Sequence, residues 1–166
     1  MHKVGYSYDP IYLEHYAPDH PERPERLKAI MNHLEKKGVL KELVQLSSLD
    51  AKTDNLRLVH SNSLIEQIEH ASSISDWIDG DTYTKPISYK AAVKAVGSCL
   101  YALDAVINGK INSAFCLVRP PGHHATPSQS MGFCLFNNLA ITAAYAINNL
   151  DLERVAIIDF DVHHGN

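Results

Sequence analysis

The chain of 166 residues lacks features that define several broad classes of protein. It has no apolar run of membrane-spanning length, and its N-terminus lacks the apolar core of a signal peptide, so we expect no membrane contact. Cysteine is scarce. The sequence contains only three, Cys99, Cys116 and Cys134, and each lies in an apolar segment. This spacing is typical of reduced core thiols and not of a disulfide framework. We therefore expect a cytoplasmic protein.

Excess charge of one sign is also missing. The formal net charge is -4 and there is no long basic run, which argues against direct, broad binding to nucleic acid. Internal repeats, low-complexity tracts and linkers are absent from the sequence as well. The composition, with 45% hydrophobic and 20% charged residues, is that of one soluble globular unit. We expect residues 1–166 to belong to a single domain.

Short apolar runs and amphipathic stretches alternate along the chain. Their lengths and periods predict strands at residues 4–8, 43–46, 113–118 and 155–158. Helices are predicted from Pro24, from a capping box at Ser63-x-x-Glu66, over 88–108, and from Asn137 or Asn138, the last with little polar face. The polar stretch 72–84 is predicted to be a loop. This order indicates an α/β fold with a parallel sheet.

The last twelve residues carry the strongest chemical signal. An apolar run ending at Ile158 leads into alternating acids and histidines, which predicts a buried parallel strand that ends in a polar cluster. In extended chain, Asp159, Asp161 and His163 would project to one side. A carboxylate and an imidazole suit zinc or a similar divalent ion better than calcium or magnesium. Asp161 and His163 are therefore a candidate ligand pair, and a catalytic site would need a third ligand from elsewhere.

A second polar cluster follows the run at 113–118. That run breaks at Arg119 and continues through two prolines and a glycine into His123 and His124. If the two strands are adjacent and parallel, their carboxyl ends lie on one edge of the sheet. The two histidine-rich loops would then form one pocket.

Four ordered motifs now resemble the histone deacetylase family, particularly its class II and bacterial branches. They are HPERPERL at 20–27, RPPGHHA at 119–125, MGFCLFNN at 131–138 and DFDVHHGN at 159–166. The resemblance implies a parallel α/β sheet with helices on both faces, and a zinc ion or another divalent metal. The family's pattern continues beyond Asn166 with a third metal-binding Asp and a late Tyr. We therefore expect residues 1–166 to be the N-terminal part of one deacetylase-like catalytic domain.

The resemblance also implies roles for individual side chains. Asp161 and His163 would bind the metal, and His124 would be the general acid and base, a task that suits the pKa of imidazole. His123 would give electrostatic support, with Asp159 orienting its ring. Asn166 would accept a hydrogen bond from His124.

Three further residues are expected to contact the substrate. Gly132 and Phe133 would wall a narrow apolar channel for an acyl-lysine chain, although a turn glycine and a core aromatic are the simpler interpretation of these residue types. Asp81 would hold the substrate backbone at the rim. The expected substrates are acetylated lysine in proteins or small acetylated amines.

Two other functions remain open from the sequence. Two-metal ureohydrolases of the arginase type have a similar fold, but they carry an Asp two residues after the motif histidine, where this chain has Gly165. One ligand for a second metal is therefore missing. The other alternative is a non-catalytic fragment with a binding or assembly role. Self-association into a homo-oligomer is compatible with any of these interpretations.

Overall fold

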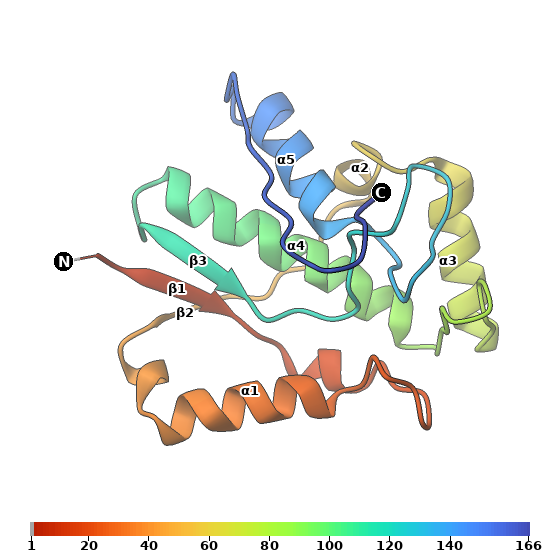
Figure 1. Cartoon of the computed structure of the whole chain (residues 1–166). Helices are drawn as coiled ribbons and strands as arrows, with labels where there is room; N and C mark the ends of the chain where they lie inside the picture. Colours follow the sequence, from red (N-terminus) through yellow and green to blue (C-terminus); the bar gives the residue numbers. More distant parts are fainter. Residues whose placement is uncertain (1) are drawn as a thin grey trace.

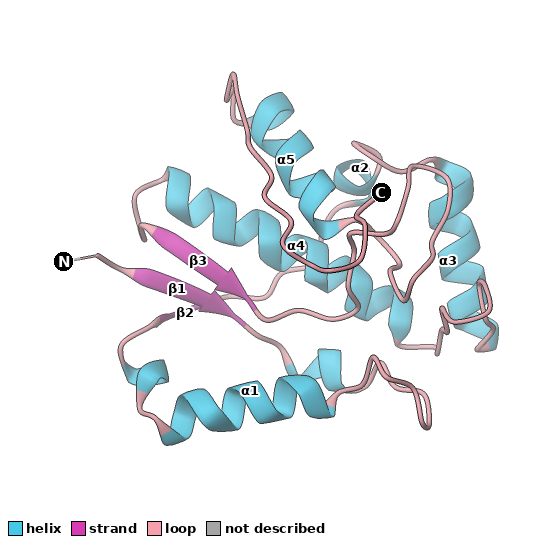
Figure 2. Cartoon of the chain, viewed as in Figure 1, coloured by secondary structure: helices cyan, strands magenta, loops and turns pink. Residues whose placement is uncertain are grey.

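Three short parallel strands form the centre of the fold. The computed structural model describes residues 2–166, and its strands lie in the order β2-β1-β3 (Figures 1 and 2). Gly5 of β1 pairs with Val44 of β2 on one side and with Ala114 of β3 on the other. The strands are β1 Val4–Ser7, β2 Val44–Leu46 and β3 Ser113–Cys116.

Helices cover both faces of this sheet. Figure 1 shows α1 on one side of the strands and α4 on the other, which confirms the predicted α/β architecture. No helix among residues 2–166 is both long and apolar enough to cross a membrane. The helices are α1 Glu25–Lys36, α2 Thr53–Leu56, α3 Asn62–Ile74, α4 Ser88–Ile107 and α5 Asn138–Asn149, with short 3-10 helices η1 Pro10–Leu13 and η2 Val39–Lys41.

The long helix α4 joins the sheet to the remaining helices. Its small residues Ala102 and Ala105 pack with Leu46 of the sheet, while Val96 packs with Ile68 of α3 in a second core cluster. Close packing also involves Gly97, where a Cβ would lie only 2.1 Å from the carbonyl oxygen of Leu49. The small side chains of α4 thus let neighbouring backbone approach closely.

The start and end of α3 differ from the prediction. Ser61, not Ser63, caps this helix, because its Oγ accepts a hydrogen bond from the N–H of Leu64 at 3.2 Å. At the other end, α3 continues into the stretch that we had predicted to be loop and ends at Ile74. Ser75 then adopts φ +60°, the left-handed conformation that often closes a helix.

Burial of α5 on most sides was predicted wrongly. Ile141 and Ala146 are buried, but Leu139 and Ile147 remain 44% and 49% exposed. The physical reason is that α5 packs against α4 and α2, so only the side of the helix that faces them is covered. Apolar composition alone did not reveal how many sides have a neighbour.

The predicted buried strand at residues 155–158 is also absent. Figure 2 shows the described chain after α5 as loop up to the C-terminus. Ile158 is 85% exposed and Phe160 is 97% exposed. A parallel strand is stabilised by ladder hydrogen bonds and by cover on both faces, and this segment has neither among the described residues.

Candidate active site

The loop that carries His123 and His124 is attached to the helical layer by a buried histidine. His60 Nε2 accepts a hydrogen bond from the N–H of Asn137 at 2.9 Å, so Nδ1 carries the proton and donates to the carbonyl oxygen of Thr126, also at 2.9 Å. Burial lowers the pKa of His60, which favours this neutral form. Asn137 also caps α5 and donates through Nδ2 to the carbonyl oxygen of Ala125. The histidine loop is therefore fixed from its far side.

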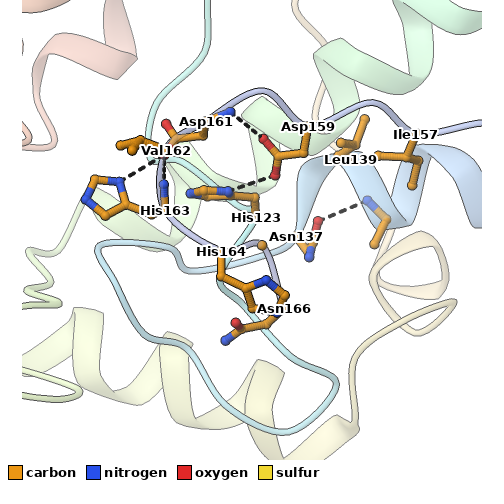
Figure 3. Close-up of a pocket in the computed structure, with 12 residues that line it drawn as sticks. His123, Asn137, Leu139, Ile157, Asp159, Asp161, Val162, His163, His164 and Asn166 are labelled. Carbon is orange, nitrogen blue, oxygen red and sulfur yellow. Dashed lines mark hydrogen bonds and ion pairs between the residues drawn. The ribbon is translucent and has the colours of Figure 1, made fainter.

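His123 contacts a carboxylate from the last motif. Its Nδ1 lies 2.9 Å from Oδ2 of Asp159, and both side chains are partly buried (Figure 3). The N–H of Asp161, and then His123 itself, lower the pKa of Asp159 below its ordinary range. An ionised Asp159 accepts the Nδ1–H of His123 and leaves Nε2 facing away from the carboxylate. This is the pair that the sequence predicted.

The ring of His124 lies close to the rings of His123 and His163. Its ring centroid is 4.1 Å from that of His123 and 6.1 Å from that of His163. Burial first, and then the neighbouring imidazoles of His123 and His163, lower the pKa of His124. The backbone N–H of His124 points to Sγ of Cys134, a fully buried thiol whose pKa is raised by burial to about 12. His124 is thus held at its backbone while its ring favours the neutral form.

Asp161 and His163 come together as the sequence predicted, at an exposed position. Oδ1 of Asp161 is 2.9 Å from Nδ1 of His163 and accepts the backbone N–H of the same residue at 2.8 Å (Figure 3). These two hydrogen bonds lower the pKa of Asp161. The donor atoms are of the kind that zinc prefers. Among residues 2–166, however, no group of three His, Cys, Asp or Glu side chains could hold a metal, so the donors fit but one ligand is missing.

Asn166 joins the last motif to the histidine loop in a different way from that predicted. Its Nδ2 donates to the carbonyl oxygen of His124 at 3.0 Å and approaches Sδ of Met131, while its backbone N–H donates to the carbonyl oxygen of His123. The predicted contact, in which Asn166 accepts from the His124 ring, is not the one that the structure shows.

The turn at residues 131–134 brings Gly132 and Phe133 to the histidines. The N–H of Cys134 donates to the carbonyl oxygen of Met131, and the two residues between them have φ values of +56° and +69°. The Phe133 N–H donates to Oγ1 of Thr82 at 3.0 Å, which attaches the turn to the loop before α4. Asp81, the predicted rim residue, immediately precedes Thr82 in the sequence.

One cavity of about 570 Å³ collects the predicted side chains. A neighbouring cavity of about 560 Å³, drawn in Figure 3, shares His123, Asp159, Asp161 and His163 with it and also reaches Asn166. Both catalytic and substrate-contacting candidates therefore meet in one region, although they come from three separate loops. The larger cavity is lined by Asp81, His123, His124, Gly132, Phe133, Asp159, Asp161 and His163, together with Glu22, Arg26, Pro121, Leu139, Ile158 and Phe160.

Comparison with known proteins agrees with this geometry. The family model of the histone deacetylase domain matches residues 20–166. The chain belongs to the histone deacetylase family. Among solved structures, the crystal structure of the HDA15 HD domain superposes with a TM-score of 0.83 and 33% identity over 89% of this chain.

Curated relatives of this chain come from several organisms. Histone deacetylase 5 of Arabidopsis thaliana is 36% identical over 99% of the chain, and the human polyamine deacetylase HDAC10 is 38% identical over 87%. A probable deacetylase of Methanothermobacter thermautotrophicus is 39% identical over 96%. The matches cover 27%, 23% and 47% of these relatives, and 44% of the HDA15 domain chain, so the sequence spans less than half of each.

A buried ion pair lies beside the candidate site, and the sequence analysis did not predict it. Arg119, three residues after the end of β3, donates through Nε and Nη2 to both carboxylate oxygens of Glu22, and through Nη1 to the carbonyl oxygen of Tyr12. Both charged side chains are almost fully buried. The available signal was a charged residue at the end of an apolar run, which is costly to bury unless it is paired.

Proposed function

We propose that this chain supplies part of the active site of a metal-dependent deacetylase. Within a complete histone deacetylase domain, it would hydrolyse the acetyl amide of acetyl-lysine or of a small acetylated amine. The observation that carries the proposal is the cavity of about 570 Å³, because His123, His124, Asp161 and His163 all line it beside Gly132 and Phe133. Family membership supports the same reaction.

Asp161 and His163 are the residues of this chain that would hold the metal. Their carboxylate and imidazole donors lie side by side at the exposed end of the site, where a further ligand could join them. A zinc ion bound there would polarise an amide carbonyl and lower the pKa of a coordinated water.

His124 is the proposed proton-transfer residue. A general base must be unprotonated at the working pH, and burial together with the neighbouring imidazoles lowers the pKa of His124 in that direction. The same ring can return the proton to the leaving amine. His123, held by Asp159, would stabilise charge beside it and keep a fixed tautomer.

The substrate would enter past Phe133 and Asp81. The ring of Phe133 gives an apolar wall that suits the methylene stem of a lysine or a polyamine, whereas Asp81 offers a carboxylate for amide or amine groups. The name of the human relative, a polyamine deacetylase, supports small acetylated amines as one substrate class. We propose a cytoplasmic location, in keeping with the free thiols of Cys99, Cys116 and Cys134.

The arginase-type alternative is less well supported. A Cβ added at Gly165 would lie 2.7 Å from Oδ2 of Asp159, the oxygen that holds His123. An Asp at this position, which a second metal would require, would therefore displace the carboxylate that orients His123.

The test is hydrolysis by a polypeptide that carries the complete domain. We expect release of acetate from an acetyl-lysine peptide or from an acetylated polyamine, loss of turnover after chelation, and recovery with zinc. Turnover that survives thorough chelation would contradict the metal-dependent mechanism. A zinc-loaded, folded protein that hydrolyses neither substrate class would favour the non-catalytic alternative.

A further inference from the structure

His20 is a buried histidine that neither the proton transfer nor the metal pair uses. It lies in the loop before α1 and contacts Asp81 and Phe133, two residues that line the cavity and that we take as the two sides of its mouth. Its Nε2 is 2.9 Å from the carbonyl oxygen of Asp81. Its ring meets that of Phe133 edge-on, with centroids 4.7 Å apart, and makes a similar contact with Tyr83. One side chain thus bridges two loops that are about 50 residues apart in the sequence.

The surrounding hydrogen bonds determine which ring nitrogen of His20 carries the proton. The N–H of Glu22 donates to Nδ1 at 3.1 Å, and this N–H has no other partner among the described residues. Nδ1 also lies 3.2 Å from the carbonyl oxygen of Glu22, but that oxygen has alternative donors in Tyr83 and Arg119. A proton on Nδ1 would leave the buried N–H of Glu22 without an acceptor. This costs more free energy than losing one of the several donors to the Glu22 carbonyl oxygen. The proton therefore belongs on Nε2, which donates to Asp81.

This donation continues into the turn that carries Phe133. Asp81 is followed by Thr82, whose Oγ1 accepts the N–H of Phe133 at 3.0 Å. The main chain of Asp81 and the ring of Phe133 are consequently both held by His20, and they are also joined to each other through Thr82. Removing the imidazole would release both sides of the mouth together.

We propose that His20 is a positioning residue for substrate binding. It fixes the Asp81 main chain with its Nε2–H and the Phe133 ring by the T-shaped ring contact, and so sets the width of the mouth through which the acylated chain enters. The proposal rests on the proposed deacetylase function for its consequence, but the contacts themselves belong to the fold.

The tautomer can be measured on the chain as it is. Long-range nitrogen–proton correlation spectra should show a protonated Nε2 and an unprotonated Nδ1 for His20. An Nε2 without a hydrogen would overturn the proposal, because it would have nothing to donate to Asp81. This measurement needs no variant and no turnover.

Two variants separate the hydrogen bond from the ring contact. His20→Phe keeps an aromatic ring but loses both nitrogens, whereas His20→Gln keeps an N–H donor near the Nε2 position and loses the ring. In His20→Phe, hydrogen exchange at the Phe133 amide should accelerate by about tenfold or more, while the Val96 amide in α4 serves as the unaffected control. His20→Gln should restore part of this protection. Unchanged Phe133 exchange in both variants would overturn the proposal.

Kinetics on the complete domain test the consequence for substrate. His20→Phe should raise KM for an acetyl-lysine peptide by about tenfold, leave kcat within about threefold, and leave zinc content unchanged. A fall in kcat at constant KM would contradict a positioning role at the mouth. If the unmodified domain showed no turnover, the deacetylase proposal would fail, while the tautomer and exchange results would still decide the role of His20 in the fold.

Discussion

Gly132 leaves no room for a side chain beside the imidazole of His124. A Cβ added at Gly132 would lie 2.4 Å from Cδ2 and 2.8 Å from Cγ of that ring. Gly132 also has φ +56°, a conformation that favours glycine. The turn at 131–134 and the proposed proton-transfer residue are therefore packed as one unit, and a change in either should displace the other.

Gly132→Ala tests this packing. The added methyl group must push the His124 ring away, and a displacement of about 1 Å at a reacting group can cost roughly a hundredfold in rate. We expect turnover by the complete domain to fall between about tenfold and a hundredfold, with the protein still folded. The measurements are kcat and the urea midpoint on the same preparation.

Gly38→Ala is the matched control. Gly38 has φ +74°, so alanine meets a similar backbone penalty of about 1 kcal/mol, but no atom lies within 4 Å of the added Cβ. This variant should lose stability and keep its kcat. Equal losses of kcat in the two variants would show that the effect at Gly132 is a general loss of folding and not displacement of His124.

Asp159→Asn isolates the carboxylate that holds His123. The amide keeps the shape but not the charge that stabilises the Nδ1–H hydrogen bond, which is 2.9 Å long in the structure. Loss of such an orienting partner typically costs about 10- to 100-fold in activity. We expect this decrease with zinc content unchanged, as measured by metal analysis alongside turnover. Loss of zinc in Asp159→Asn would make Asp159 a ligand.

Metal binding by this chain should be weak. The paired donors are Asp161, whose side chain is about half exposed, and His163, whose side chain is about three-quarters exposed. No third ligand joins them among the described residues. Zinc titration by calorimetry should therefore give low affinity, and a competing chelator should remove the ion. Stoichiometric zinc that resists the chelator would contradict the ligand count. In the complete domain, Asp161→Ala and His163→Ala should each abolish zinc binding and hydrolysis together.

The position of the loop that carries His123 and His124 could be predicted because strand direction determines it. β1 and β3 are adjacent and parallel, so the loop after Cys116 emerges at the carboxyl edge where active sites of such sheets gather. The prediction of a strand at 155–158 was wrong, and the last motif reaches the pocket as loop. An apolar run indicates that burial is favourable, but it does not show which surface would cover Ile158. The same limitation applies to α5, where Leu139 and Ile147 are apolar and exposed.

The supporting residues could not be predicted from the sequence. Glu22 and Arg119 are separated by 97 positions, and His60 and Asn137 by 77, so only the folded chain shows that they are partners. His20 was visible in its motif, but its contact with Asp81 depends on how two loops meet. Motifs indicate which side chains react, whereas the hydrogen bonds that hold them come from distant segments.

His15 should make stability depend on pH. Burial, followed by the nearby charge of Arg119, lowers its pKa to about 3, compared with about 6.5 in an unfolded chain. Between these values the unfolded chain binds the additional proton, so this contribution to stability is fully present above about pH 6.5 and is lost as pH falls. The slope is at most about 1.4 kcal/mol per pH unit.

Urea unfolding of His15→Asn measures that contribution. The Asn side chain can still contact Oγ of Ser88, which lies 2.7 Å from Nδ1 of His15, but it does not titrate. The free energy of unfolding should therefore fall less steeply between about pH 6.5 and pH 4 in the variant than in the unmodified chain. Parallel curves over this range would show that His15 is not the group responsible.

His124→Ala separates proton transfer from metal binding. A positioned acid or base typically contributes between a hundredfold and ten-thousandfold, so kcat of the complete domain should fall by about two to four powers of ten. Zinc content should stay the same, because His124 is not one of the paired donors Asp161 and His163. His123→Ala should reduce kcat less, since its proposed role is electrostatic support. The two measurements must be made on the same samples: if either substitution emptied the metal site, loss of zinc would accompany loss of turnover, and the histidine pair would be ligands and not proton-transfer residues.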